Sequence, residues 1–351
     1  MKGELRVGLI GCGRISARHM EVLGAIGQLR LVAVCDLAGG RRERAAARSG
    51  ATGYADYHEM IRAERLDVVS ILTESGSHAR IGIDVAPHVG ALVVEKPMAL
   101  TLEDADRLIE VCDEHRTRLF VVKQNRYNPA IVRLRQAFEA GRFGKLVMGS
   151  VRVRWCRTQD YYDQDGWRGT WRDDGGVFTN QASHHLDLLQ WFMGPVESVM
   201  AYTATRLVDI ETEDTGIAVF RFLSGALGVA EATTAARPTD LEGSLSILGE
   251  AGAVVVGGFA VSRIDVWNFA ELHPSDAEAR QIGVAAPSVY GLGHYAFYQD
   301  AVNALRTGRR AMLDGLEGRK SLELVNAIYE SAATHAEVRL RYVPRGVALG
   351  R

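Results

Sequence analysis

Short apolar runs alternate with amphipathic segments along the first 125 residues of the chain. The amphipathic segments have the apolar spacing that is typical of helices covering a sheet. Because the apolar runs are separated by helices, they predict a parallel sheet with both faces covered. The runs predicted to be strands lie at 5–10, 31–35, 67–72, 91–94 and 119–123.

The pattern changes between residues 123 and 130, after which longer strand-like stretches dominate. They follow one another with a single predicted helix among them, at 183–192, which is typical of an antiparallel sheet. The sequence therefore predicts an α/β domain over residues 1–125 and an α+β domain with a mostly antiparallel sheet over residues 126–351. The stretches predicted to be strands lie at 146–155, 196–205, 216–222, 226–235, 244–248 and 251–256. The other helices are expected at 128–140, 293–305 and 316–335.

Composition excludes several classes of protein. The 351 residues are 47% apolar and carry a formal net charge of −2, which argues against nucleic acid or a membrane surface as a partner. No run of about 18 apolar residues and no secretory leader is seen, so a cytoplasmic protein is expected. The four cysteines are far apart and form no CxxC pair, and they are therefore predicted to be reduced thiols.

Glycines and small residues occupy the turn between the first predicted strand and the first predicted helix. Gly11 and Gly13 permit a tight turn, and the helix N-terminus offers unpaired N–H groups to a pyrophosphate. Ser16 stands where a third glycine is usual and is still small enough for close packing of helix and strand. The motif in this context predicts a dinucleotide-binding Rossmann domain. The residues expected to contact the dinucleotide are Gly11, Cys12, Gly13, Arg14, Ile15 and Ser16.

Asp36 ends the second predicted strand. A carboxylate at this point can accept hydrogen bonds from ribose hydroxyls and would repel a 2′-phosphate, so NAD is favoured over NADP as the cofactor. Arg41 and Arg42 weaken that preference, because a nearby arginine can accommodate the phosphate.

Glu95, Lys96 and Pro97 directly follow the predicted strand at 91–94, at the edge of the sheet where ligands bind in this fold. Together with the glycine turn, Asp36 and a segment around His184, they resemble the Gfo/Idh/MocA family of oxidoreductases over essentially the whole chain. The resemblance implies a Rossmann domain followed by a domain with an open-faced sheet. It also implies that this second domain binds a small-molecule substrate and self-associates into a dimer or tetramer.

The segment around His184 also departs from the family pattern. The resemblance places the catalytic histidine at His184 and the acid that follows it at Asp187, whereas Asn180 replaces the usual aspartate and Ala182 a glycine. Asn180 and the residues around it resemble the subgroup of UDP-N-acetylglucosaminuronate 3-dehydrogenases. The implied reaction is NAD-dependent oxidation of a secondary hydroxyl, at C3, of a nucleotide-linked sugar acid.

Oxidising an alcohol requires a base for the hydroxyl proton and a hydride acceptor. His184 is the candidate base, because its place near a helix start favours the neutral imidazole. Lys96 is the competing candidate, since its ammonium can polarise the substrate oxygen or relay a proton. Lys96 is assigned the hydrogen-bonding role, and the division of labour stays open. No third ligand accompanies His184 and Asp187, so no metal ion is expected.

The remaining candidates flank the expected cleft. Arg126 could form charge-assisted bonds to a carboxylate or phosphate. Glu74 stands where the family often has proline. Residues expected at the cofactor are Thr73, His78, Glu95, Lys96, Trp167 and Arg168. Residues expected at the substrate are Lys96, Asn125, Arg126, Tyr161, Asn180, His184 and His294.

Two other functions remain open at this point. One is a dehydrogenase of a free sugar or inositol, which would not bind a UDP-sugar. The other is a non-catalytic regulator that senses NAD or a metabolite. The presence of both Lys96 and His184 counts against the regulator, because a sensor requires neither group.

Overall fold

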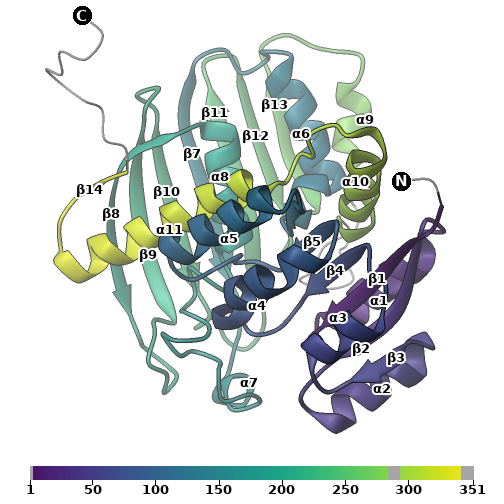
Figure 1. Cartoon of the computed structure of the whole chain (residues 1–351). Helices are drawn as coiled ribbons and strands as arrows, with labels where there is room; N and C mark the ends of the chain where they lie inside the picture. Colours follow the sequence, from purple (N-terminus) through teal and green to yellow (C-terminus); the bar gives the residue numbers. More distant parts are fainter. Residues whose placement is uncertain (1–2, 284–292, 341–351) are drawn as a thin grey trace, which may run out of the picture.

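A parallel sheet of six strands forms the first part of the molecule in the computed structural model, which describes residues 3–283 and 293–340 (Figure 1). The strands run in the order β3-β2-β1-β4-β5-β6, and every neighbouring pair is parallel. Their bounds are Leu5–Ile10 (β1), Leu29–Cys35 (β2), Thr52–Tyr54 (β3), Val68–Ile71 (β4), Ala91–Val94 (β5) and Arg118–Val121 (β6). The predicted parallel sheet is confirmed, with β3 as an additional short strand.

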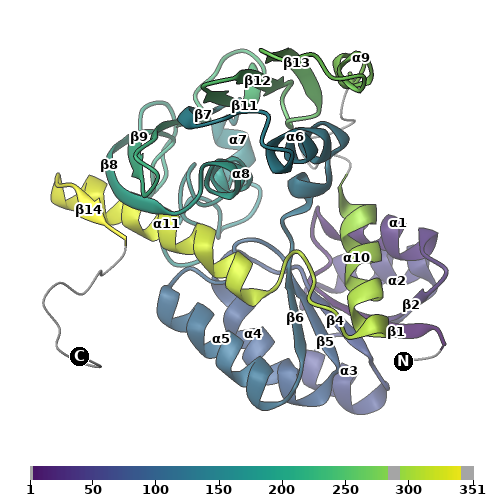
Figure 2. The same ribbon diagram turned by 90° about the horizontal axis from the view of Figure 1, so that it is seen from above.

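Helices cover both faces of this sheet (Figure 2). One face packs against α3, α4 and α5, whereas α1 packs on the other face together with α10, from near the end of the chain. Phe297 and Tyr298 of α10 share that core with Val22 and Phe120, so the late helix packs as part of the first domain. The division at residue 125 stays a prediction. The helix bounds are Ser16–Ala25 (α1), Gly39–Ser49 (α2), Tyr57–Ala63 (α3), His78–Val85 (α4), Leu102–Glu114 (α5) and His294–Thr307 (α10).

An eight-stranded sheet forms the second part of the molecule, in the order β13-β12-β11-β7-β10-β9-β8-β14. It is antiparallel except for the pairing of β10 with β7, so the predicted, mostly antiparallel sheet is confirmed. The bounds are Leu146–Arg154 (β7), Val196–Ala204 (β8), Thr215–Phe222 (β9), Leu227–Thr233 (β10), Glu242–Gly249 (β11), Gly252–Gly257 (β12), Arg263–Phe269 (β13) and Val338–Arg339 (β14).

The helices within residues 3–283 and 293–340 cover one face of the second sheet and leave the other open. Buried side chains of α6, α8 and α11 form one core with the inward side chains of the strands. Figure 2 shows α8 and α11 on the side of the sheet that faces the first domain. On the opposite face Ile217 and Val219 of β9 are 52% and 50% exposed. The bounds of the remaining helices are Pro129–Glu139 (α6), Gln159–Tyr162 (α7), Ser183–Met193 (α8), Asp276–Arg280 (α9) and Gly315–Thr334 (α11).

None of the described helices combines the length and the apolar composition needed to cross a membrane. The longest, α11, has twenty residues and alternates charged with apolar positions. Its buried residues face the second sheet and α5, which places α11 between the two parts of the molecule.

Candidate active site

The turn between β1 and α1 has the shape that its glycines predict. Gly11 has a φ of +95°, and a Cβ at this position would lie 2.7 Å from the backbone of Leu72, so that only glycine fits. A Cβ at Gly13 would meet nothing within 4 Å, because this residue faces open space. The first turn of α1 has no side-chain cap. The turn therefore leaves backbone N–H groups free to receive an anion.

Asp36 fixes this turn to the end of β2. Its Oδ2 accepts a hydrogen bond from the N–H of Cys12 at 2.7 Å, and its Oδ1 accepts one from Ala38 at 2.8 Å. Arg42 donates to the carbonyl oxygen of Asp36 at 2.9 Å, and Arg41 is ion-paired with Asp165. Both arginines thus have partners within the chain, which makes them less available to a 2′-phosphate. The carboxylate of Asp36 therefore favours NAD over NADP as the cofactor.

A cavity of about 1200 Å³ lies between the two parts of the molecule, directly beside this turn. It continues from the glycine turn past the ends of β4 and β5 to the start of α8. Most of the residues predicted from the sequence line it, which brings the cofactor and substrate candidates into one space. These lining residues are Gly11, Cys12, Gly13, Arg14, Ile15, Asp36, Thr73, His78, Glu95, Lys96, Tyr161, Trp167, Arg168, Asn180 and His184.

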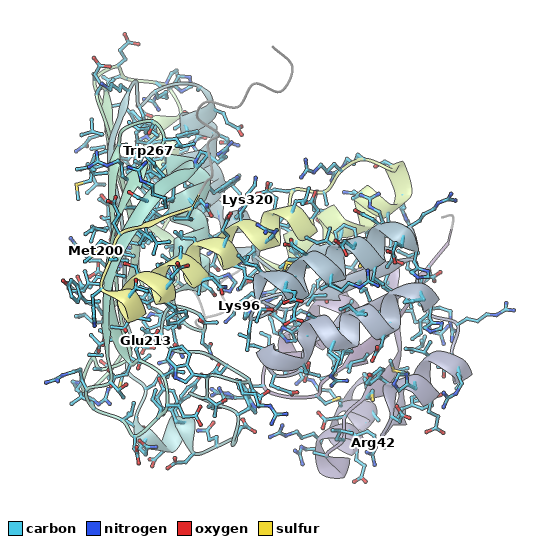
Figure 3. All side chains as sticks on the ribbon, turned by 60° about the vertical axis from the view of Figure 1, so that its left-hand side comes forward. Arg42, Lys96, Met200, Glu213, Trp267 and Lys320 are labelled. Atoms are coloured by element: carbon cyan, nitrogen blue, oxygen red, sulfur yellow. The ribbon has the colours of Figure 1, made fainter. Side chains whose placement is uncertain are left out.

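Lys96 follows β5, lines this cavity and lies where the two parts of the molecule meet (Figure 3). Its Nζ donates to the carbonyl oxygen of Asn180 at 2.7 Å and lies 3.4 Å from the side-chain Oδ1 of the same residue. Burial lowers the pKa of Lys96, whereas the carboxylates of Glu95 and Asp174 raise it. The ammonium is therefore held at a fixed point beside the predicted base.

His184 is the second residue of α8 and is only 8% exposed. Its Nε2 lies 3.2 Å from the side-chain nitrogen of Gln124. Burial lowers the pKa of His184 well below its ordinary value, and the charges of Lys96 and Lys123 lower it further. The imidazole is consequently neutral at physiological pH, which is the form that can accept a proton.

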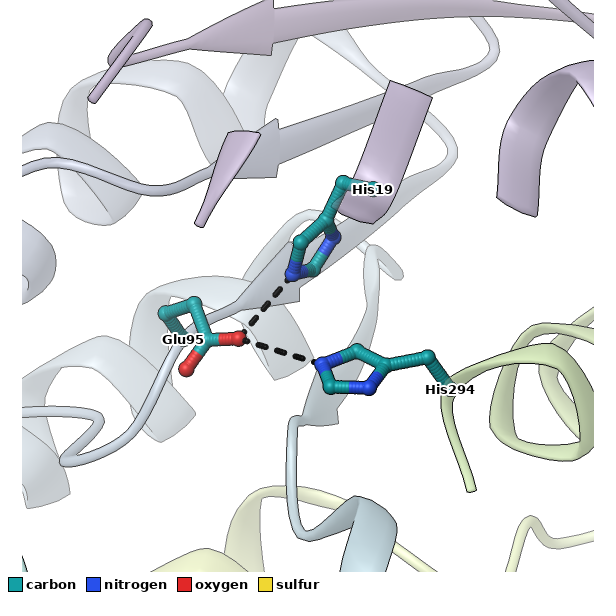
Figure 4. Close-up of side chains that lie close together, drawn as sticks. All are labelled: His19, Glu95 and His294. Atoms are coloured by element: carbon teal, nitrogen blue, oxygen red, sulfur yellow. Dashed lines mark hydrogen bonds and ion pairs between the residues drawn. The ribbon is translucent and has the colours of Figure 1, made fainter. Parts of the chain in front are cut away.

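Glu95 lies between Lys96 and a buried pair of histidines, His19 and His294, and Figure 4 shows its contacts with the two histidines. Its Oε2 accepts a hydrogen bond from the backbone N–H of Lys96 at 2.9 Å, and its Oε1 is bonded to His19 at 3.0 Å. His19 is in turn 2.7 Å from the hydroxyl of Tyr298. Burial alone would raise the pKa of Glu95, but the hydrogen bond and charge of His19 lower it to about 2.

His294 lies in this buried cluster rather than at the cavity. It is fully buried, with its Nε2 4.0 Å from Glu95, and it does not line the cavity. Among the described residues, His19, Glu95 and His294 are the one group close enough to hold a metal ion, with ligand atoms within 4.8 Å of one another. The oxygens of Glu95 already accept hydrogen bonds from His19 and Lys96. The expectation that no metal is bound stays a prediction.

Arg126 likewise lies inside the protein. Its Nε and Nη2 donate to the two oxygens of Asp187 at 2.8 and 2.7 Å, and its Nη1 donates to Glu317 at 2.9 Å. The guanidinium that was expected to bind a substrate anion thus has two carboxylate partners within the chain. The neighbouring Asn125 is also buried, and neither residue lines the cavity.

The loop that contains Tyr161, Trp167 and Arg168 covers the cavity on the side of the second domain. Arg168 donates to the hydroxyl of Tyr161 at 2.8 Å, and its guanidinium stacks on Trp167 at 4.5 Å from the ring centre. Asp165 in the same loop pairs with both Arg168 and Arg41. The loop is therefore tied to the first domain across the cavity.

Two further side chains, those of His78 and Ser16, hold the loops beside the cavity in place. The ring nitrogens Nδ1 and Nε2 of His78 lie 2.7 and 3.0 Å from the carbonyl oxygens of Pro97 and Thr73, so that the side chain joins the loops after β4 and β5. Ser16 donates from its hydroxyl to Gly13 at 2.6 Å, which closes the glycine turn. Ser16 itself is buried and is not a lining residue.

Sequence reasoning missed three buried polar groups around this site. Gln124 contacts His184, Lys123 adds its charge near the imidazole, and Asp174 accepts a hydrogen bond from Asn180. Burial lowers the pKa of Lys123 to about 8. Gln124 lines the cavity, but nothing in the sequence pairs it with His184. No motif marks Asp174 or Lys123, and only the packing of distant segments shows their contacts.

A Rossmann domain whose cavity brings a glycine turn, a lysine and a neutral histidine together defines a two-domain, NAD-dependent oxidoreductase. The family model described as an oxidoreductase family with an NAD-binding Rossmann fold matches residues 5–123. The GFO/IDH/MocA C-terminal domain model matches residues 131–255. The chain belongs to the Gfo/Idh/MocA family, as its motifs predicted.

Solved structures of high similarity cover nearly the whole chain. The WlbA dehydrogenase from Bordetella pertussis, in complex with NADH and UDP-GlcNAcA, is 44% identical with a TM-score of 0.91, covering 98% of this chain and 99% of that one. The WlbA dehydrogenase from Chromobacterium violaceum, with the same two ligands, is 42% identical with a TM-score of 0.92, covering 98% of both chains.

A relative of different specificity is also similar. Myo-inositol 2-dehydrogenase from Thermotoga maritima is 32% identical over 236 residues, which are 65% of this chain and 68% of the relative. Within the family, this chain is thus similar both to dehydrogenases that bind a nucleotide sugar and to an inositol dehydrogenase.

Proposed function

We propose that this chain is an NAD-dependent dehydrogenase that oxidises the C3 hydroxyl of a UDP-linked amino sugar acid such as UDP-GlcNAcA (UDP-N-acetylglucosaminuronate). One observation carries the proposal. Lys96, Asn180 and His184 meet in a cavity of about 1200 Å³ that extends to the glycine turn, so that a dinucleotide and a second large ligand have room side by side. Similarity over the full length to two dehydrogenases crystallised with NADH and UDP-GlcNAcA supports it.

The side chains at the cavity divide the chemistry between them. The neutral imidazole of His184 accepts the proton of the substrate hydroxyl. The ammonium of Lys96 donates a hydrogen bond to the same oxygen and stabilises the negative charge that develops as the proton leaves. NAD, when bound, supplies the hydride acceptor.

Recognition of a sugar acid requires cations inside the cavity. Arg14, Arg157 and Arg168 line it, and arginine forms charge-assisted, bidentate bonds to carboxylates and phosphates. In this proposal they replace Arg126 as the groups that meet the anionic parts of the ligands.

Substrate comparison tests the proposal. NADH formation should be measured with UDP-GlcNAcA, with UDP-GlcNAc, which lacks the carboxylate, and with myo-inositol. We expect kcat/KM for UDP-GlcNAcA to exceed the other two values by about a hundredfold or more, because only its carboxylate adds a charge-assisted contact to the arginines that line the cavity. A preference for myo-inositol would overturn the proposal and favour the second candidate, an inositol dehydrogenase, which the relative from Thermotoga maritima supports.

The proposed location is the cytoplasm. Cys12, Cys35 and Cys112 are free and buried, and burial raises the pKa of each thiol to about 12. Such thiols are suited to a reducing compartment, in which no disulfide is needed. Detection of the protein in a secreted fraction would contradict this placement.

A further inference from the structure

The side chain of Asn180 links a buried carboxylate to the ammonium of Lys96. Its Nδ2 donates to Oδ1 of Asp174, while its backbone and side-chain oxygens face the Nζ of Lys96 at 2.7 and 3.4 Å. Asp174 itself does not line the cavity and is only 1% exposed. Hydrogen bonds therefore connect Asp174 in the protein interior, through Asn180, to Lys96 in the candidate active site.

The carboxylate decides which way the amide of Asn180 points. An ionised carboxylate only accepts hydrogen bonds, so it must meet the NH2 group of the amide rather than its oxygen. The amide oxygen is consequently turned toward the ammonium of Lys96, which only donates. Without Asp174 the amide could rotate and present its NH2 group to another donor.

The surroundings of Asp174 hold it in one place. Its Oδ2 accepts a hydrogen bond from the N–H of Gly169 at 2.8 Å. The charged and titratable groups that face it are Lys96, Arg168, Glu213 and Tyr162. Burial raises the pKa of Asp174 to about 6, although the hydrogen bonds from Gly169 and Asn180 and the two cations oppose this effect.

We propose that Asp174 is a positioning residue, which acts through Asn180 to orient Lys96 and places a negative charge behind its ammonium. This inference rests on the proposed function insofar as Lys96 is a catalytic group. The role of Asp174 toward Lys96 can nevertheless be measured without turnover.

The pH dependence of Lys96 acylation tests the proposal. Lys96 faces the cavity, so a small amine-reactive reagent such as acetic anhydride should reach it. Peptide mass spectrometry reports the acylated fraction of Lys96 at each pH, and the midpoint of this curve is the quantity compared. In D174N the midpoint should shift to lower pH by about one unit, because the carboxylate that favours the ammonium is lost. An unchanged midpoint in folded D174N would overturn the proposal.

Asp276→Asn provides the matched control. Asp276 is another buried carboxylate, bonded to Arg142 and Trp267, and does not line the cavity. Its loss should lower thermal stability and leave the Lys96 midpoint at the wild-type value. An equal shift in this variant would mean that any buried substitution moves the midpoint, and would overturn the specific role of Asp174.

The exchange variant D174N/N180D keeps the question decidable if D174N does not fold. It moves the carboxylate next to Lys96, so the midpoint should return to the wild-type value or above. A midpoint below wild type would overturn the proposal.

With UDP-GlcNAcA, kcat should fall by about tenfold or more in D174N, while the KM for NAD stays within about twofold. If the wild type does not turn over this substrate, the proposed function fails, whereas the acylation result still decides the role of Asp174.

Discussion

Lys96 and His184 both line the cavity, but their surroundings favour the charged form of the lysine and the neutral form of the histidine. Two carboxylates, Glu95 and Asp174, favour the charged form of Lys96 against the effect of burial. Burial and the neighbouring cations keep His184 neutral. A hydrogen-bond donor and a proton acceptor therefore stand side by side at neutral pH, which is the pairing that alcohol oxidation requires.

Replacing either group should stop chemistry and spare cofactor binding. In Lys96→Met and His184→Ala we expect kcat to fall by about a hundredfold or more, since the proposed mechanism needs His184 to accept the hydroxyl proton and Lys96 to stabilise the charge on the oxygen. The glycine turn and Asp36 stay intact, so the affinity for NADH, measured by fluorescence titration, should change by less than about threefold. Turnover close to wild type in both variants would contradict the assignment of the site.

The sequence predicts those residues whose position follows from local structure. Lys96 could be predicted because it follows a strand at the ligand-binding edge of the sheet, and Asp36 because it ends another. The buried positions of Arg126 and His294 could not be predicted, since their partners come from far along the chain. Glu317, for example, is separated from Arg126 by 191 residues. Asp174 was missed for the same physical reason, because its contact with Asn180 carries no motif.

At the scale of elements, the ion pairs of Arg126 join three parts of the structure. The residue belongs to the short helical turn Gln124–Tyr127, Asp187 belongs to α8, and Glu317 to the first turn of α11. The guanidinium also lies 4.8 Å from the ring centre of Trp191. These contacts hold α8, and with it His184, in its place at the end of β6.

Arg126→Met should therefore destabilise the protein rather than weaken substrate binding. Removing the guanidinium leaves buried carboxylates unpaired, which costs about 3–5 kcal/mol of the free energy of unfolding. Chemical denaturation measures this loss. Arg319→Met is the matched control, because its pair with Asp106 is more exposed and contributes no more than about 1 kcal/mol. A large rise in KM without loss of stability would instead restore the substrate role expected from the sequence.

Apolar periodicity predicts the long elements and misses the short or half-exposed ones. β3 has three residues without a buried side chain, and β13 alternates exposed Arg263 and Asp265 with buried positions, so neither forms an apolar run. The parallel pairing of β7 with β10 was also missed, because the order of strands along a chain does not specify which of them pair.

At the scale of the whole molecule, the open face of the second sheet is the surface expected to mediate self-association. Ile217 and Val219 lie side by side on it with half of their side-chain surface exposed. The double variant I217E/V219E should shift the expected dimer or tetramer toward monomer in sedimentation equilibrium, because like charges cannot be buried unpaired. Leu272→Glu, at an 84% exposed site, serves as the control. A wild type that sediments as a monomer would contradict the prediction.

Hydride transfer from C3 of the sugar acid to NAD is the central claim about this molecule. Incubating the wild-type protein with NAD and UDP-GlcNAcA deuterated at C3, followed by mass spectrometry of the cofactor, tests it most directly. We predict that the NADH formed carries the deuterium. NADH without deuterium would show that another carbon is oxidised, and the absence of NADH would contradict the proposed reaction altogether.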